Sequence, residues 1–513
     1  MLNLTQKLIG GMYLKPGNDN SINQIKIGAV ISYLAIGVSL LSGLLYTPWM
    51  VKQIGLNDYG LYTLATSLIS IFLIDFGISE AVSRFISKYN AEGDQKKVND
   101  FLGLIYKLYI LIDILILVLL IIVYFLFPVI YMELTPGEIE KFKIIYLITS
   151  TFSIVSLPFI TLNGILTSYE KFKTLKLCDL INKLMVLTLM VIALLLGYKL
   201  YALVLVNVFA GLFIIGVKLL YINKRLPIKV NFKYWDKRLL KEVFGFSIWA
   251  TVSTIANRFV FNITPSILGA VSGSSQIAIF GIASTLEGYA YIISGAVNGM
   301  FLPKVSKILA KRNDGVHVLP LMIKVGRIQY SIIGLIFVGF TIVGKEFIYL
   351  WMGKDFELAY YCALLMMLPG VFRVPQQIAS ITIIAMNKVK IQALVYVIVA
   401  TLNIIFSSIL SQYFGVLGAA ISICLVYIIR LIIMNIIYYK VLHINIFSFI
   451  KDCYVKMAPP MLITLAIGII INQFTIYSLP TFLIKGTFIV VLYIILLWKI
   501  SLNHYEKSFF KRV

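Results

Sequence analysis

Charged and amide side chains interrupt several long apolar stretches of the sequence, and their types favour the binding of an anion. The candidates for direct contact with a substrate are Arg84, Asn257, Arg258, Arg327 and Arg373. A guanidinium group is planar, keeps its charge and donates two parallel hydrogen bonds to a phosphate or carboxylate. These residues therefore predict a binding site for an anionic headgroup such as a diphosphate.

Acidic residues in the same apolar stretches suit a different task. Charges at membrane depth are costly and are functional candidates by default. Asp75 and Glu287 are therefore candidates for binding a coupling proton or sodium ion. Asp113 and Arg430 also lie in apolar stretches, and we expect these two to join helices.

Structural roles compete with these assignments. Arg84 and Arg327 lie near the predicted cytoplasmic ends of their helices, from which long basic side chains can reach the membrane surface. Arg258 and Glu287 lie in neighbouring predicted helices, so an ion pair between them is the alternative to a role in transport.

The sequence has no pattern typical of covalent or metal chemistry. Its four cysteines and three histidines are widely separated, without the spacing of metal ligands. It also lacks a nucleophile elbow, a P-loop and a glycine-rich nucleotide fingerprint. We therefore expect no catalytic residue, no metal and no cofactor, and a protein that is not an enzyme.

The composition indicates the elements that position these residues. Of 513 residues, 60% are hydrophobic and only 13% are charged, and the mean hydropathy is +0.94. Soluble domains are about half apolar and about a quarter charged. An all-α polytopic membrane protein of about fourteen transmembrane helices is predicted, with twelve or thirteen as alternatives. The candidate spans are 27–51, 59–86, 101–131, 142–167, 177–197, 200–222, 242–269, 276–303, 319–343, 358–386, 391–412, 416–439, 457–477 and 481–500.

The charge distribution predicts the orientation. The net charge is +23, and the basic residues gather in alternate connections between the spans. Basic loops stay in the cytoplasm, so both termini are expected there. The same distribution argues against a nucleic-acid partner. Residues 1–22 are mostly polar, and no cleavable signal is expected.

The two halves of the sequence match at an offset of 217 residues. Prolines carry the most weight in this comparison, because each one disrupts a helix at a specific place. The offset pairs Thr47-Pro48 with Thr264-Pro265, Pro158 with Pro375, and Lys171 and Lys173 with Lys388 and Lys390. It predicts two six-helix lobes related by a parallel repeat, with two C-terminal helices outside the duplication.

This repeat divides the chain into four predicted parts. Residues 1–222 form the N-terminal six-helix lobe, and 223–241 form a basic cytoplasmic linker. Residues 242–445 form the C-terminal six-helix lobe, and 446–513 hold helices 13 and 14 and a cytoplasmic tail. Two lobes of this kind are typical of an alternating-access carrier.

A run of about 50 residues resembles a known family. It contains Thr47-Pro48, Gly55-Leu56-Asn57-Asp58-Tyr59-Gly60-Leu61-Tyr62, Ile74-Asp75-Phe76-Gly77-Ile78-Ser79, Arg84-Phe85-Ile86-Ser87-Lys88-Tyr89 and Ala91-Glu92-Gly93-Asp94. This run is similar to the opening of bacterial polysaccharide repeat-unit flippases (Wzx-like), which belong to the multidrug/oligosaccharidyl-lipid/polysaccharide exporter superfamily. Beyond it the likeness lies in length, span count and duplication.

The resemblance implies a function. Such proteins move undecaprenyl-diphosphate-linked oligosaccharides from the inner to the outer leaflet of the bacterial cytoplasmic membrane, for O-antigen, capsule or exopolysaccharide synthesis. It implies a V-shaped bundle in contact with membrane lipid and a polysaccharide polymerase as a partner. It also implies a cationic cavity, for which Arg258, Arg327 and Arg373 are the candidates here, because the family has no strict motif.

Two other functions compete with this one. An ion-coupled multidrug antiporter of the same superfamily would favour cationic drugs, so acidic residues should dominate its cavity. A membrane-embedded glycosyltransferase or polymerase would need a large outer loop, and the predicted outer loops are short. The arginines and the two additional spans favour the flippase.

Overall fold

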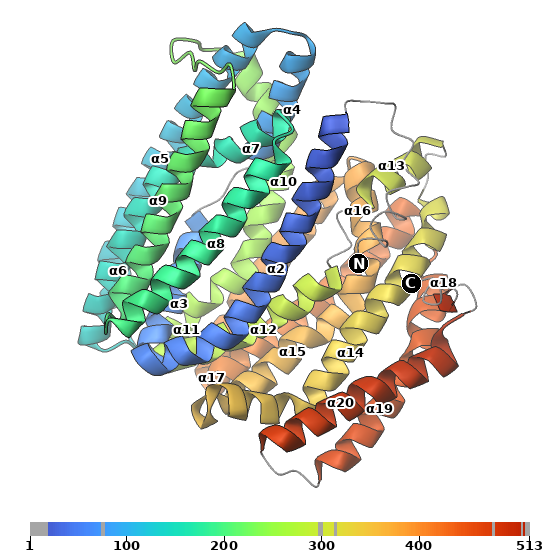
Figure 1. The fold of residues 1–513 in the computed structure, drawn as a ribbon. Helices are drawn as coiled ribbons and strands as arrows, with labels where there is room; N and C mark the ends of the chain where they lie inside the picture. The colour runs from blue at the N-terminus through green and yellow to red at the C-terminus, as the bar shows by residue number, and fades with distance from the viewer. Residues whose placement is uncertain are drawn as a thin grey trace. The chain divides into compact units, whose positions relative to one another are not determined.

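The computed structural model describes residues 19–72, 77–295, 301–311, 315–473, 478–503 and 506–507. The regular elements of these residues are helices (Figure 1). Eleven of the helices in this described part are long and apolar enough to cross a membrane. The predicted class, an all-α polytopic membrane protein, is confirmed.

The span count depends on how long elements are divided. Helix α17 (Val389–Leu442) has 54 residues and would be about 80 Å long, far more than the roughly 30 Å of a bilayer core. Gly415 interrupts it with a φ of 54° and a ψ of −133°, between the predicted spans 391–412 and 416–439. The number fourteen itself stays a prediction.

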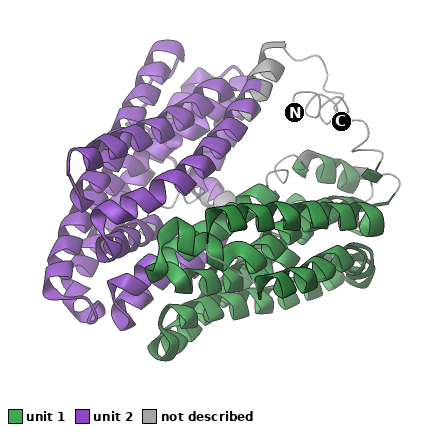
Figure 2. Cartoon of the chain, turned by 60° about the horizontal axis from the view of Figure 1, so that its bottom comes forward, with its two compact units in different colours: residues 1–14, 279–513 green, residues 15–278 purple. Residues whose placement is uncertain are grey.

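The chain forms two compact units, which Figure 2 distinguishes by colour: the described part of unit 2 ends at Ala278, and that of unit 1 begins at Ile279. Within unit 2, α2 packs on α8, α4 on α7 and α3 on α6. Its helices are α2 (Asp19–Ile54), α3 (Leu56–Phe72), α4 (Ile78–Ala91), α5 (Gln95–Ile130), α6 (Pro136–Ser156), α7 (Thr161–Ser168), α8 (Phe172–Leu195), α9 (Leu200–Arg225), α10 (Lys237–Asn262) and α11 (Thr264–Val271).

Unit 1 is arranged around α14, which packs against α15, α19 and α20. Helix α12 begins at the end of unit 2 and continues into unit 1. The helices of this part are α12 (Ser274–Gly295), α13 (Leu302–Lys311), α14 (Leu319–Met352), α15 (Glu357–Arg373), α16 (Gln377–Ala385), α17, α18 (Ile446–Phe449), α19 (Lys456–Asn472) and α20 (Leu479–Leu496).

The division between the units falls later than the predicted linker 223–241, and local contacts explain the difference. The backbone N–H of Asn231 donates to the Asn99 carbonyl at 3.1 Å, and its side-chain amide donates to Asp100 at 2.6 Å. The segment is thereby held on α5, and α10 and α11 pack on α3. The predicted domain boundaries follow the duplication in the sequence, and they stay a prediction.

Backbone geometry recurs at the predicted offset of 217 residues. Pro158 lies in a 3₁₀ turn (Leu157–Ile160) before α7, and Pro375 lies in a 3₁₀ turn (Val374–Gln376) before α16. Glu170 and Asn387, also 217 residues apart, both have a φ of 56°. Non-glycine residues seldom adopt this left-handed conformation, so its recurrence supports the duplication.

The capping of helix ends outside the spans follows ordinary chemistry. Asp236 precedes α10, and its carboxylate accepts hydrogen bonds from the backbone N–H groups of Arg238 and Leu239. These hydrogen bonds lower the pKa of Asp236, because they stabilise its charged form. This cap marks the end of the segment 226–236 and the start of α10.

Gly60, in the stretch that carries the family resemblance, lies at a close helix contact in unit 2. A Cβ atom at this position would lie 2.0 Å from the backbone oxygen of Ser274. Overpacking of this kind costs about 1–3 kcal/mol. Gly60→Val should therefore lower the yield of folded protein, measured by size-exclusion chromatography in detergent. Gly37→Val is the matched control, since nothing lies within 4 Å of the Gly37 Cβ position; equal yields would contradict the prediction.

Candidate functional site

Arg373, at the C-terminal end of α15, lies between two tyrosine rings in unit 1. Its guanidinium carbon is 4.7 Å from the ring centroid of Tyr291 and 4.7 Å from that of Tyr427. A terminal nitrogen of Arg373 is 3.5 Å from Oε1 of Glu287. Glu287 and Tyr291 are four residues apart on α12, so one helix face supplies both contacts.

The ion pair of Arg373 and Glu287 is largely removed from solvent and leaves donors unused. The side chain of Arg373 is 17% exposed and that of Glu287 is 11% exposed. The Nε atom of Arg373 is buried and has no hydrogen-bond partner among the described residues. Buried charges are stable only when hydrogen bonds satisfy them. The guanidinium group of Arg373 therefore keeps one donor that no described protein group satisfies.

Arg430 on α17 adds a second guanidinium group to the same cluster. Its side chain is buried, and its terminal nitrogen donates to the Tyr396 hydroxyl at 2.9 Å. Its Nε atom also has no partner within the described part of the chain. Tyr396 and Tyr427 each interact electrostatically with both Arg373 and Arg430. In the described residues, this cluster therefore contains two guanidinium groups and one carboxylate.

The sequence did not indicate this role for Arg430, which was expected only to join helices. One signal was present, because Tyr427 and Arg430 are three residues apart and share a helix face. In the structure, however, Arg430 lies over the ring of Tyr396 at 4.8 Å, whereas the ring of Tyr427 is contacted by Arg373. The signal is weak in a chain with 31 tyrosines.

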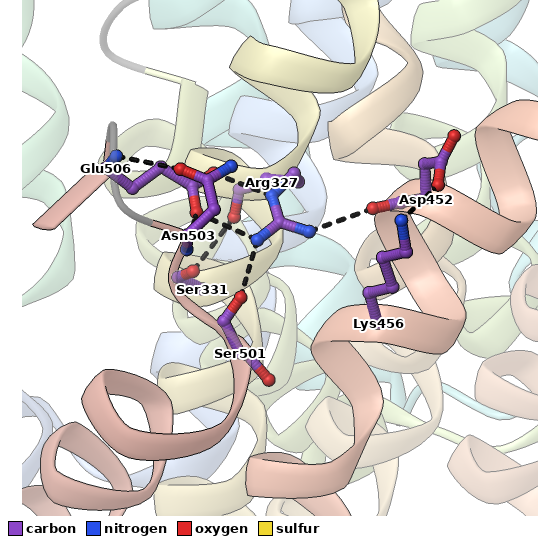
Figure 3. A network of polar contacts seen from close by, with 7 residues as sticks. All are labelled: Arg327, Ser331, Asp452, Lys456, Ser501, Asn503 and Glu506. Carbon is purple, nitrogen blue, oxygen red and sulfur yellow. Dashed lines mark hydrogen bonds and ion pairs between the residues drawn. The ribbon is translucent and has the colours of Figure 1, made fainter.

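Arg327 has different partners from Arg373 and belongs to a closed network of hydrogen bonds (Figure 3). It is buried and donates to the Glu506 carboxylate and to the backbone oxygens of Asp452 and Ser501. Protein groups thus already occupy the donors that a substrate would need. Its predicted role at the substrate remains untested, and these contacts favour a structural one.

The remaining candidates belong to unit 2. Arg258 on α10 is half-buried and donates to the Ser70 carbonyl oxygen at 2.8 Å. Asn257 is exposed on the same helix, and Arg84 is exposed on α4. Asp75 lies outside the described residues. Glu287 is ion-paired with Arg373, whereas the alternative weighed from the sequence was a pair with Arg258.

A different buried cation in unit 2 is compensated internally. Lys218 on α9 donates to Oδ1 of Asn163 at 2.9 Å and lies 3.5 Å from Oδ1 of Asp179. These partners come from α7 and α8, so the contact joins three helices. The positive charge of Lys218 is balanced by Asp179, whereas the Arg373 cluster contains two guanidinium groups and one carboxylate. This excess of positive charge makes the Arg373 cluster the candidate anion site.

The likeness to known sequences agrees with the membrane fold. A family described as polysaccharide biosynthesis protein matches residues 26–309. A Shigella flexneri protein assigned as an O-antigen transporter is 25% identical over 220 residues, which cover 42% of this chain and 50% of that protein. The chain thus spans about half the length of this curated relative.

Solved structures show the same fold at low sequence identity. The lipid II flippase MurJ, in an inward closed conformation, superposes with a TM-score of 0.69 at 16% identity, covering 94% of this chain and 98% of that one. An inward-facing multidrug resistance MATE transporter of the MOP superfamily gives 0.66 at 13% identity, covering 80% and 96%. With the family match extending over more than half of the chain, the protein belongs to the polysaccharide biosynthesis protein family and has the fold of the MOP superfamily of transporters.

Proposed function

We propose that the protein is a flippase for undecaprenyl-diphosphate-linked oligosaccharides. It moves these repeat units from the inner to the outer leaflet of the bacterial cytoplasmic membrane for surface polysaccharide synthesis, by alternating access. The family and the fold support a transporter of this pathway. The observation that carries the choice of substrate is the excess of guanidinium groups around Arg373 and Arg430.

The chemistry of the cluster suits a diphosphate better than a cationic drug. A diphosphate has several acceptor oxygens, and both Arg373 and Arg430 have an unused Nε donor. Charge-assisted hydrogen bonds of this kind are about twice as strong as neutral ones. A cationic drug would instead meet two positive charges.

Glu287 gives this site a means of coupling to an ion gradient. Its carboxylate lies at the edge of Arg373 that an anionic headgroup would take. A proton on Glu287 would weaken its attraction to Arg373 and free that edge for the substrate. We therefore assign Glu287 to ion coupling; Asp75, the other candidate, stays a prediction.

Arg258, Asn257 and Arg84 are proposed to contact the substrate from unit 2. Arg258→Ala should reduce surface polysaccharide at least about tenfold, because a charged hydrogen bond contributes about 1.5–3 kcal/mol. Surface polymer is measured by immunoblot in cells that carry only the variant. Arg225→Ala, at the exposed end of α9, is the control and should leave the polymer unchanged. Normal polymer with Arg258→Ala would remove this residue from the site.

The proposal includes the orientation of the protein and its partners. We propose that both termini lie in the cytoplasm, that membrane lipid surrounds the helices, and that a polysaccharide polymerase uses the translocated units. The alternating basic loops support this orientation.

Depletion of the protein tests the proposed function in cells. We expect complete undecaprenyl-diphosphate-linked repeat units to accumulate while surface polysaccharide disappears, and mass spectrometry of the lipid pool identifies the sugar. An unchanged pool with increased sensitivity to cationic drugs would contradict the proposal and favour the multidrug antiporter.

A further inference from the structure

One guanidinium group, that of Arg327, meets three separate segments at the C-terminal end of the chain (Figure 3). Its Nε donates to Oε1 of Glu506 at 2.6 Å, and a terminal nitrogen donates to Oε2 at 2.8 Å. That nitrogen also donates to the Ser501 carbonyl at 2.6 Å, and the other donates to the Asp452 carbonyl at 3.0 Å. Such a bidentate pair with two added carbonyls leaves little of the guanidinium unused.

Both carbonyl acceptors of Arg327 belong to π-helical turns. Asp452 lies in the turn Ile450–Val455 that leads into α19, and Ser501 ends the turn Leu497–Ser501 that follows α20. Such turns are rare. Ser501 lies at a C-terminal helix end, where carbonyls lack a partner within the helix, whereas Asp452 lies before the start of α19. Arg327 donates to both carbonyls and therefore joins the two π-helical turns.

Two hydrogen bonds with Asn503 position the side chain of Glu506 for its contact with Arg327. The backbone N–H of Asn503 donates to Oε2 of Glu506 at 2.9 Å, and the backbone N–H of Glu506 donates to Oδ1 of Asn503 at 2.9 Å. The side chain of Glu506 is 9% exposed. Reciprocal hydrogen bonds with Asn503 therefore fix the Glu506 side chain beside Arg327 of α14.

A second buried ion pair joins the same elements near the other end of α14. Glu346 is 2% exposed, and its Oε2 lies 3.4 Å from Nζ of Lys485 on α20. The hydroxyl of Thr481 donates to Oε1 of Glu346 at 2.9 Å. Arg327 and Glu346 are 19 positions apart on α14, about 28 Å, which is close to the thickness of the hydrocarbon core.

The two ion pairs have opposite polarity along α14. The helix presents an arginine at one end and a glutamate at the other, and the α20 segment presents Glu506 and Lys485 in the matching order. A reversed hairpin would place like charges together at both ends, so the pattern fixes its direction. Between the pairs, the Asn472 amide of α19 donates to the Ile342 carbonyl at 2.6 Å.

We infer that these two ion pairs make the hairpin of α19 and α20 a fixed part of unit 1, which moves with α14 as one body through every conformational change. Arg327 is then a positioning residue that holds both helices and Glu506. All these contacts lie within unit 1, and only the polysaccharide readout of the cross-linking experiment rests on the proposed function.

Hydrogen–deuterium exchange of the purified protein tests the role of Arg327. Glu506→Gln should increase exchange at least about tenfold in peptides from both π-helical turns, because a buried ion pair loses its charge. Glu357→Gln is the matched control, since Glu357 pairs with Lys345 of α14 at 2.7 Å but is 44% exposed. If exchange becomes faster only in residues after Ser501, Arg327 does not join the two π-helical turns, and the inference is overturned.

Cross-linking tests whether the hairpin and α14 move together. Ile342→Cys and Gly468→Cys are combined, because a Cβ at Gly468 would lie within 3.1 Å of three side-chain atoms of Ile342. Each single variant serves as a control, and the native cysteines of the described residues are buried. Oxidised cells should form the disulfide and keep surface polysaccharide within about twofold of the reduced cells. Absence of the disulfide, or loss of polysaccharide that a reductant restores, would overturn the inference.

Discussion

Arg373→Ala is expected to abolish transport. The substitution removes the guanidinium group held between Tyr291 and Tyr427, and with it the unused Nε donor of this site. Losing one partner of a buried charged hydrogen bond costs about 3 kcal/mol, or roughly a hundredfold in binding. The measurement is surface polysaccharide in cells that carry only the variant, normalised to the amount of protein in the membrane.

Two companion variants separate function from stability. Arg373→Ala leaves the Glu287 carboxylate buried without its ion pair, which is destabilising by itself. Combining Arg373→Ala with Glu287→Ala removes both charges and should restore folding but not transport. Arg373→Lys keeps the charge but loses the planar fork, so we expect transport to fall by about tenfold. Recovery of transport in the double variant would contradict a substrate role for Arg373.

Glu287→Gln is expected to separate substrate binding from the ion gradient. Glutamine has the shape of a protonated glutamate, so it should leave Arg373 free for the headgroup. In the described part of the chain, Glu287 faces Arg373 on α15 and Tyr427 on α17. In vesicles, the variant should bind lipid-linked diphosphate at least as tightly as the native protein. Its translocation rate should stay within about twofold with or without a pH gradient.

The control for Glu287→Gln is another glutamate of the chain. Glu80 is exposed on α4, and Glu80→Gln should respond to the gradient as the native protein does. A Glu287→Gln variant that keeps the full gradient response would show that the coupling group lies elsewhere. Asp75 would then be the next candidate.

The fold class could be predicted because it follows from local properties of the sequence. Apolar stretches of sufficient length must form helices in a bilayer, and prolines and glycines mark their interruptions. Gly415 divides α17 between two predicted spans, and Pro158 and Pro375 both lie in 3₁₀ turns. None of these inferences required knowledge of which helices are neighbours.

The pairing of charges could not be predicted, because it depends on contacts between distant segments. Arg327 and Glu506 are 179 residues apart, and Glu287 and Arg373 are 86 apart. The sequence placed Arg327 and Arg373 in one class of candidates. In the structure, Arg327 is satisfied by protein groups, whereas Arg373 keeps an unused donor. Tertiary contacts alone distinguish a structural arginine from an available one.

The contacts of the predicted linker are a second feature that the sequence does not indicate. Residues 223–241 are basic and polar between two spans, a composition typical of a domain boundary. The structure packs Asn231 against α5, and a Cβ on Gly103 would lie 1.8 Å from the Asn231 carbonyl oxygen. A polar segment can therefore pack directly on a helix where a glycine allows the two backbones to approach.

The most direct test of the proposed function is translocation by the purified protein in lipid vesicles. A radiolabelled undecaprenyl-diphosphate oligosaccharide is placed in the inner leaflet, and an added glycosidase cleaves the saccharide that reaches the outer leaflet. We expect the native protein to expose the saccharide to the glycosidase. Vesicles with Arg373→Ala should show the same cleavage as empty vesicles. Equal exposure with native protein and with empty vesicles, while a cationic drug is transported, would contradict the proposed function.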